Sequence, residues 1–260
     1  MKKLDLFNSI NIYTDASTTN AYTSTDKITS SPGYVIVYNN IIRLYGNKII
    51  NGTNSSYGEM YAILMGIKAV YREIISGRLP YNTPINIFSD SLSSIENLRN
   101  NFKNWYILDN IIRKTYDDKE VINQDIIRKI IEIVNKYKIP VNLYHIKGHA
   151  QIKLNKKSNL SDRVELNKII EMFFQYNRIL ITDTEAAELC YYNIFVDNFT
   201  RYNMKENMTS SIYHNSNYIK PRLNNTKLTK EDLKVFSEYI NGGEWLWSLM
   251  YLKIHTISEN

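Results

Sequence analysis

The sequence predicts an α/β protein in which a mixed β-sheet carries helices on its faces. The first observation is a repeat: residues 10–15 (INIYTD) return almost unchanged as residues 85–90 (INIFSD), and both copies are rich in β-branched and aromatic residues. The second is the order of expected elements before residue 150, which is β-β-β-α-β-α-α-β. The connections after the first strand and after the repeat are long enough for parallel pairing.

The N-terminal part is expected to form one strand followed by an antiparallel hairpin. Asn39 and Asn40 give a turn signal between two apolar segments, and Asn51-Gly52 breaks the chain after the second segment. The expected elements are a strand at residues 10–16, a polar loop at 17–31, and strands at 34–38 and 41–50.

Helices are expected where apolar residues recur at helical spacing, as Met60, Ile63 and Ile67 do. Gly77 follows this helix, and Pro140 ends a later one. The expected elements are helices at residues 60–71, 92–101 and 125–138 and strands at 85–89 and 141–146, while the aromatic and basic segment at 105–119 is also expected to be helical.

After residue 150 the pattern predicts helices joined by loops. Ser161 is a candidate N-cap for one helix, and residues 182–185 (TDTE) form a capping box for a second. Residues 209–225 are polar and are expected to form a loop, and Thr229 is expected to cap a last helix. The aromatic run at residues 245–251 is expected to pack against the protein, with a partner surface as the alternative.

The net charge of +6 and the isoelectric point near 9.1 favour an anionic partner, nucleic acid first, although a generic basic surface gives the same values. The single cysteine, Cys190, excludes an internal disulfide and fits a reducing compartment, so we expect a cytoplasmic protein. Its apolar neighbours suggest a buried helical thiol. The sequence shows no secretory signal and no membrane span, so no membrane partner is expected.

Each copy of the repeat ends in an aspartate, Asp15 or Asp90, at the same register. Because side chains alternate between the faces of a strand, the two carboxylates share one phase. If the strands are parallel neighbours, roughly 4.8 Å apart, the carboxylates lie side by side at their C-terminal ends. Like charges that close repel, so one carboxylate takes up a proton unless a divalent cation is bound. The repeat therefore predicts a metal site.

A third acid, Glu59, lies in the first turns of the helix after the hairpin, on the side of Ala62 and Ile63. A carboxylate on the core side of a helix is unusual unless it is paired or bound to metal. The alternative is an N-terminal glutamate that complements the helix dipole. Asp15 and Asp90 likewise have an alternative as polar residues that close a strand, which the matched repeat makes less favourable.

Five motifs, in order and at matching spacing, resemble type 1 ribonuclease H. The resemblance covers about residues 8–150 and 190–203 and implies an RNase H-like five-stranded mixed sheet with helices on both faces, a helical insertion and a C-terminal helical extension. The motifs are TDAS at residues 14–17, GEMYA at 58–62, FSDS at 88–91, HIKGHA at 145–150 and NIFVDNFTR at 193–201.

The resemblance implies a four-carboxylate site of Asp15, Glu59, Asp90 and Asp197 that holds two Mg²⁺ ions, with Mn²⁺ as a possible substitute. The family cuts the RNA strand of an RNA–DNA hybrid. One ion helps to ionise the attacking water and the other stabilises the leaving 3′ oxygen. His149 matches the family's mobile histidine, which relays protons or assists product release; the alternative is a surface loop histidine.

Three short polar residues match family positions near the nucleic-acid backbone: Ser55, Ser91 and Asn123. Serine and asparagine are also ordinary helix caps, so both interpretations stand. A basic handle for the substrate is implied by Trp105, Arg113, Lys114 and Lys119, and we expect it to be weak because Asp109, Asp117 and Asp118 lie among them.

The chain departs from the family pattern through a long insertion between His149 and Asp197. Asp162 and Asp183 therefore compete with Asp197 for the fourth acid; Asp162 is nearer the usual distance, and Asp197 has the better local motif. We expect a catalytic domain of residues 8–150 and 183–204, a helical insertion at 151–182 and a C-terminal extension at 205–260. The inserted helix either covers the site as a lid or wall, or serves structural packing.

These observations predict a metal-dependent endonuclease that hydrolyses the RNA strand of RNA–DNA hybrids and leaves 5′-phosphate ends. One alternative is a nuclease of the same fold that acts on DNA, as a resolvase or transposase core does. The other is a non-catalytic nucleic-acid-binding module, which the intact set of acids disfavours. The sequence does not indicate which protein partners, if any, the chain has.

Overall fold

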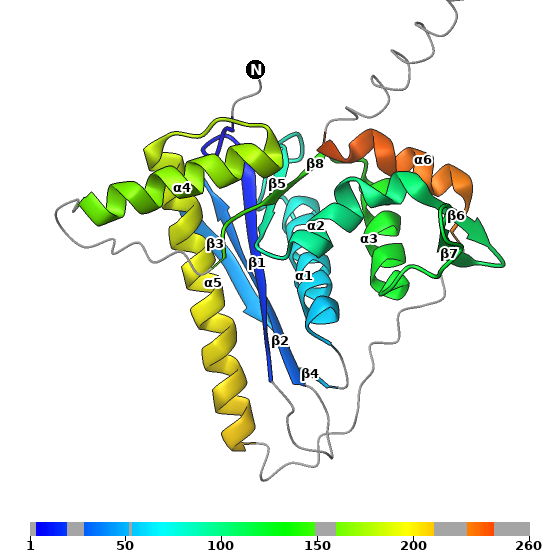
Figure 1. Ribbon diagram of the computed structural model, residues 1–260, viewed down its shortest axis with the longest axis horizontal. Helices are drawn as coiled ribbons and strands as arrows, with labels where there is room; N and C mark the ends of the chain where they lie inside the picture. The colour runs from blue at the N-terminus through cyan, green and yellow to red at the C-terminus, as the bar shows by residue number, and fades with distance from the viewer. Residues whose placement is uncertain (1–3, 20–28, 52–53, 149–159, 211–227, 242–260) are drawn as a thin grey trace, which may run out of the picture.

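The computed structural model describes residues 4–19, 29–51, 54–148, 160–210 and 228–241. A mixed sheet of strand order β3-β2-β1-β5-β8 lies at its centre (Figure 1), and the short β4 pairs with the start of β2. Pairing is antiparallel across β3-β2-β1 and parallel across β1-β5-β8, which confirms the predicted five-stranded mixed sheet. The strands are β1 (Ile10–Thr18), β2 (Thr29–Tyr38), β3 (Ile41–Asn47), β4 (Ile50–Asn51), β5 (Ile85–Ser89) and β8 (Val141–His145).

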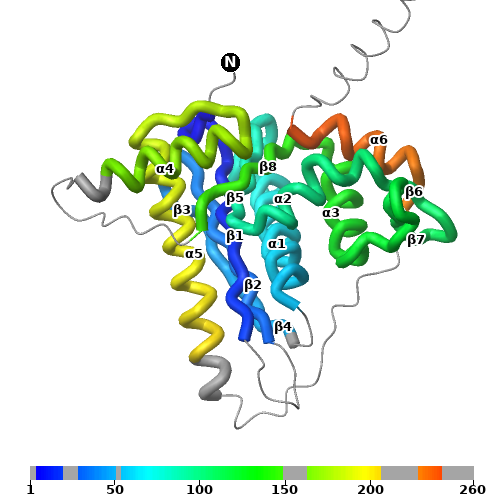
Figure 2. Tube along the Cα trace, viewed as in Figure 1, coloured from blue at the N-terminus to red at the C-terminus, as the bar shows by residue number. Residues whose placement is uncertain are grey.

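Helices cover both faces of the sheet, as predicted. The first face packs against α1 (Ser55–Ile75), α2 (Leu92–Arg99), α3 (Gln124–Tyr137) and α6 (Lys230–Tyr239), and the second against α4 (Leu160–Asn177) and α5 (Asp183–Ser210) (Figures 1 and 2). Strand residues alternate between these layers: Ile12 and Ile87 belong to the first core, and Tyr13 and Phe88 to the second. Asp15 therefore shares the α5 side with Tyr13.

A row of asparagines fixes the register of the three parallel strands. Asn11, Asn86 and Asn142 are register partners, and both Asn11 and Asn86 are buried. Asn86 donates to the side-chain oxygen of Asn11 (3.0 Å) and to the hydroxyl of Ser9 (2.8 Å), and it accepts from Asn142 (3.0 Å). A slip by one residue would move these amides into an apolar layer without partners. The row therefore holds β1 and β5 in the alignment that the sequence repeat predicts.

The structure corrects the sequence predictions for two segments before residue 120. The segment at residues 105–119, expected to be helical, forms a separate hairpin of β6 (Trp105–Leu108) and β7 (Ile111–Lys114) after the 3₁₀ turn at Asn101–Asn104. Its turn residues Asp109 and Asn110 have positive φ, as a two-residue hairpin turn requires. The loop expected at 17–31 begins and ends as strand, because β1 continues to Thr18 and β2 starts at Thr29.

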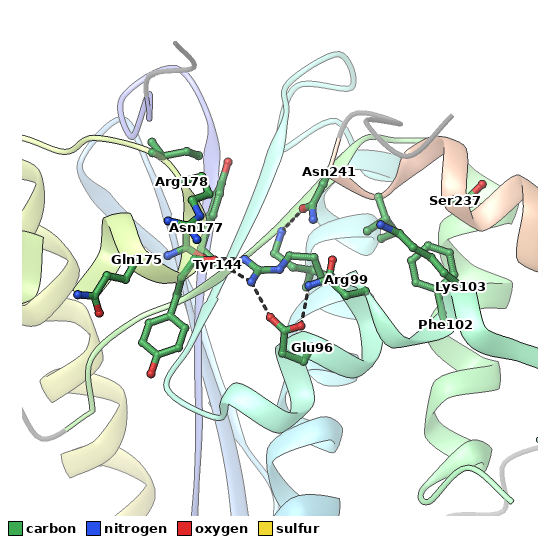
Figure 3. Close-up of a pocket in the computed structure, with 15 residues that line it drawn as sticks. Glu96, Arg99, Phe102, Lys103, Tyr144, Gln175, Asn177, Arg178, Ser237 and Asn241 are labelled. Atoms are coloured by element: carbon green, nitrogen blue, oxygen red, sulfur yellow. Dashed lines mark hydrogen bonds and ion pairs between the residues drawn. The ribbon is translucent and has the colours of Figure 1, made fainter. Parts of the chain in front are cut away.

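The outer edge of β8 is closed by side chains from distant parts of the chain (Figure 3). The N–H of Leu143 donates to Asn241 (2.8 Å), and the N–H of His145 donates to Asn177 (3.0 Å), whose amide in turn donates to the His145 carbonyl (2.7 Å). Arg99 donates to the same Asn177 oxygen (2.8 Å). Arg99, Leu143, Asn177 and Asn241 also line a cavity of about 530 Å³ beside the strand. The outward-facing amides of Leu143 and His145 are thus occupied.

After residue 150, the predicted N-cap at Ser161 was wrong, because Ser161 lies inside α4, which already includes Leu160, whereas the two later caps are present. Thr182 and Glu185 bond each other's backbone at the start of α5, and Thr229 forms a capping box with Asp232 at the start of α6. Cys190 is buried in α5 as expected, and burial raises the pKa of its thiol to about 12. In the described part of the chain, no helix combines the length and the apolar character that a membrane crossing needs.

The inserted helix α4 packs on β8 and α5 and contributes Ile169 and Phe173 to the second core. These contacts are those of structural packing. The expected loop at residues 209–225 overlaps the end of α5, which runs to Ser210, and the rest of it lies outside the described residues, as does the aromatic run at 245–251. The division into catalytic domain, insertion and extension stays a prediction.

Replacing Asn86 by Leu is expected to lower the free energy of unfolding by about 2–4 kcal/mol, because the buried Asn11 oxygen and the half-buried Asn142 amide both lose their bond to Asn86. Urea denaturation followed by circular dichroism measures the change. Asn101→Ala, which removes an exposed bond to Asn97 only, is the control and is expected to cost less than about 0.5 kcal/mol. Equal stability of the two variants would contradict a register-fixing role.

Candidate metal centre and its surroundings

Asp15 and Asp90 come together where the parallel pairing of β1 and β5 ends. The last paired residues are Thr14 and Ser89, and each aspartate follows directly. Asp90 lies beyond the end of β5, whereas β1 continues for three residues past Asp15, paired to β2 alone. The predicted juxtaposition of the two carboxylates is therefore present, although only one of the two strands ends at this point.

Glu59 completes a group of three acids from the opposite layer. It lies in the second turn of α1, which begins after Asn54, whose side chain accepts from the N–H of Tyr57 (2.7 Å). One ligand atom from each of Asp15, Glu59 and Asp90 lies within 4.8 Å of the others. Among the described residues, the Oε2 atom of Glu59 is buried with no hydrogen-bond partner. A buried carboxylate oxygen in this position calls for a cation or a proton.

The electrostatics of this group favour protonation when no cation is present. Burial, followed by the carboxylates of Asp90 and Asp197, raises the pKa of Asp15 to about 7, while the N–H of Ala16 opposes the shift by donating to Asp15 (2.8 Å). Burial, followed by Asp15 and Asp90, raises the pKa of Glu59 well above its usual value. The free-energy cost of ionising these acids comes from burial and from like charges packed together, so a divalent cation bound among them would lower that cost.

Asp197 of α5 lines the same cavity of about 880 Å³ as the three acids. Its carboxylate interacts with Asp15, and it also forms a 2.7 Å ion pair with Arg201, one helical turn further on. Asp183 begins α5, about 21 Å along the helix from Asp197, and does not line the cavity. Asp162 falls in α4, and its side chain lies outside the described residues. Asp197 as the fourth metal ligand stays a prediction.

A close approach of α5 to the sheet sets the position of Asp197. Gly33 is the register partner of Asp15, and a Cβ atom added to it would lie 2.5 Å from the Thr200 methyl group. The Thr200 hydroxyl is 3.1 Å from that of Ser17 on β1 and donates to the Asp197 carbonyl (2.9 Å). The missing side chain at Gly33 thus lets α5 lie directly on β2, next to Asp15 on β1.

The motif that resembles the family's histidine loop contains a residue whose role the sequence analysis missed. His145, at the end of β8, places its Nε2 atom 3.1 Å from the Asp90 carbonyl, and burial lowers the pKa of its imidazole. A Cβ atom added to Gly148 would overlap the Asp90 carboxylate, so only glycine allows this approach. Lys147 pairs with Glu165 of α4. His149 itself lies outside the described residues.

The relation between His145 and Asp90 follows from the pairing of two strands. It begins the HIKGHA motif and is the register partner of Ser89, immediately before Asp90. The pairing of β5 with β8, rather than any local signal, makes that relation visible.

The residues expected to contact substrate lie at the cavity or next to it. Ser55 and Ser91 line the cavity, and the Ser91 hydroxyl donates to Ser94 (2.9 Å). Asn123 does not line the cavity, but its amide donates to the hydroxyl of Ser56 (3.3 Å), and Ser56 is a lining residue. Contact of these side chains with nucleic acid stays a prediction.

The expected basic handle is the β6-β7 hairpin. Trp105 is buried there, Arg113 lies 3.7 Å from Asp118 and 3.8 Å from Glu120, and Lys119 lies 3.6 Å from Asp117. These acidic neighbours offset the positive charge of the hairpin.

The RNase H family model matches residues 8–164, which is more than half of the chain. The chain therefore belongs to the RNase H family. This match agrees with the mixed sheet and with the acids gathered at the ends of its parallel strands.

Several solved structures are similar to this one at low sequence identity. LC11-RNase H1, isolated from compost by a metagenomic approach and crystallised with an RNA/DNA hybrid, is 16% identical, with a TM-score of 0.39 over 53% of this chain and 85% of that chain. RNase H1 from the halophilic archaeon Halobacterium salinarum is 13% identical, with a TM-score of 0.35 over 53% and 85%. The RNase H domain of prototype foamy virus is 13% identical, with a TM-score of 0.43 over 65% and 94%. No curated protein is similar enough to count as a match.

Magnesium is expected to raise the melting temperature more at about pH 8 than at about pH 5. Asp15 has a folded-state pKa of about 7, against 3.8 for an unperturbed aspartate, so the folded protein binds more protons than the unfolded chain between these values. Stability without cations therefore falls as the pH rises from about 4 to about 7, and at low pH the bound proton competes with the metal.

The measurement is differential scanning fluorimetry with Mg²⁺ and with EDTA at both pH values. A shift of a few degrees is expected at the higher pH for millimolar binding. A shift of the same size at both pH values, or an unchanged shift in Asp15→Asn, would be inconsistent with proton–metal competition at this group.

Gly33→Ala is expected to destabilise the protein by about 1–3 kcal/mol, because the new methyl group overlaps the Thr200 methyl and pushes α5 from the sheet. Thr200→Ser removes that methyl group and keeps the hydroxyl that faces Ser17. The double variant Gly33→Ala/Thr200→Ser should therefore recover most of the loss, as a double-mutant cycle in urea would measure. If the changes in unfolding free energy of the two single variants simply add in the double variant, the contact between residues 33 and 200 is not the cause of the destabilisation.

Proposed function

We propose that this protein is a metal-dependent ribonuclease H that hydrolyses the RNA strand of RNA–DNA hybrids and leaves 5′-phosphate ends. The observation that carries the proposal is the group of Asp15, Glu59 and Asp90, whose ligand atoms lie within 4.8 Å of one another in a chain of the RNase H family. Oxygen ligands of this kind suit Mg²⁺ or Mn²⁺.

The residues present fit a pair of divalent ions. Asp15, Glu59 and Asp90 would hold them, with Asp197, which lines the same cavity, as the fourth carboxylate. When bound, two ions supply Lewis-acid stabilisation of the attacking and leaving oxygens of the phosphodiester. The buried Glu59 oxygen without a partner supports this fit, because a cation would satisfy it without a proton.

The remaining residues orient the acids and the substrate. His145 holds the Asp90 backbone, and Gly148 leaves room for the Asp90 carboxylate beside the loop. We assign His149, which follows Gly148, the transfer of protons or the release of product. Ser55, Ser91 and Asn123 would contact the sugar–phosphate backbone, which matches the positions of the two serines on the cavity wall.

A nuclease of the same fold that acts on DNA remains the second candidate, because related acid clusters serve both reactions. Hybrids labelled on either the RNA or the DNA strand, compared with double-stranded DNA, distinguish the two. Release of labelled RNA fragments with 5′-phosphates is expected. Cleavage of DNA with intact RNA would favour the alternative, and binding without cleavage in Mg²⁺ or Mn²⁺ would favour a non-catalytic module.

Asp90→Asn is expected to lower the rate of hybrid cleavage more than about 100-fold, because the neutral amide loses both the charge and a ligand atom for the cation. The circular dichroism spectrum should not change. Asp109→Asn, at the exposed turn of the β6-β7 hairpin, is the matched control and should retain full activity. Unchanged Mg²⁺-dependent cleavage by Asp90→Asn would contradict the assignment of the site.

A further inference from the structure

Helix α5 continues well past the acid that it contributes to the site. It runs from Asp183 to Ser210, so more than three turns follow Asp197. In Figure 1 this part of the helix extends beyond the ends of β1 and β2. Three of its residues, Arg201, Met204 and Lys205, line the cavity that holds the acids. These three residues are called the α5 wall below.

The α5 wall is positively charged and lies on one face of the helix. Asp197, Arg201 and Lys205 follow one another at intervals of four residues, so their side chains stack along one side, about 6 Å apart. The first pair forms the 2.7 Å ion pair already described, and Arg201 and Lys205 are both exposed to solvent. Half of the Arg201 side chain remains accessible despite the ion pair.

A substrate with a phosphate backbone needs positive charge near this cavity. The four acids repel phosphates, and the cations that they bind act only at the reacting phosphate. The hairpin expected to supply a basic handle has its arginine and one lysine beside acidic side chains. The α5 wall also has an acidic neighbour, because Arg201 pairs with Asp197, but Arg201 and Lys205 both line the cavity that holds the acids.

We propose that Arg201 and Lys205 bind backbone phosphates of the nucleic-acid strand next to the phosphate that reacts, and that α5 serves as a substrate-binding wall. The inference rests on the proposed function, since it takes the acid group as the point of reaction. Contacts of this kind carry no sequence information; they add affinity that weakens with salt and fix the register of the strand in the cavity.

The experiment measures binding of a fluorescein-labelled RNA–DNA hybrid by anisotropy, without divalent cations, over a series of salt concentrations. Lys205→Ala is expected to raise the dissociation constant several-fold at about 0.1 M salt and to reduce the slope of log K against log salt by about one. Arg201→Ala/Lys205→Ala should reduce that slope by about two, and Lys205→Arg should restore the parental value.

Lys234→Ala is the matched control, because Lys234 is an exposed lysine of α6 that does not line the cavity. It should leave both the affinity and the slope at the parental values. Thermal melting checks that each variant is folded. Parental affinity and slope in a folded Lys205→Ala would overturn the proposal, as would an equal loss in Lys234→Ala.

The two proposals fail separately. If the wild-type protein cleaves hybrid but Lys205→Ala binds it as the parent does, the α5 wall is wrong and the ribonuclease assignment stands. If the wild-type protein cleaves no hybrid in Mg²⁺ or Mn²⁺, the ribonuclease assignment fails, and the metal-free binding series still decides whether α5 holds phosphates.

Discussion

The in-register pairing of β1 with β5 is the constraint on which the site depends. It brings Asp15 and Asp90 side by side after Thr14 and Ser89, where two like charges repel each other. The asparagine row opposes that repulsion from within the sheet, because Asn86 bonds to Asn11 and Asn142 across all three parallel strands. The repulsion between these acids opposes stability at one end of the strands, and a divalent cation bound among them would relieve it.

Helix α5 lies at the same end of the sheet, although its residues come much later in the sequence than those of β1 and β5. Gly33 and Thr200 let it lie against β2, and this contact places Asp197 in the cavity with the acids of β1, β5 and α1. The ion pair between Lys147 and Glu165 connects helix α4 to the segment that approaches Asp90. Helix α4 thus holds the segment that carries Gly148, which lies beside the Asp90 carboxylate.

The sheet and three of the acids were predictable because their signals are local. The repeat in residues 10–15 and 85–90 encodes both the strand type and the shared register, and the spacing of Met60, Ile63 and Ile67 places Glu59 near the start of a helix. The hairpin at Trp105–Lys114 was missed although Asp109-Asn110 is a turn signal, because its mixed aromatic and basic composition was taken for a helix. The roles of His145 and of the Gly33–Thr200 contact arise only when strands and helices far apart in the chain pack together.

The occupied edge of β8 restricts how this protein can associate with others. Asn177 and Asn241 already bond the outward-facing amides of Leu143 and His145, so an extended peptide finds no open donors there. A strand from another molecule that paired along Leu143 to His145 would first have to displace the Asn177 and Asn241 side chains, which discourages a sheet from continuing between molecules on this flank.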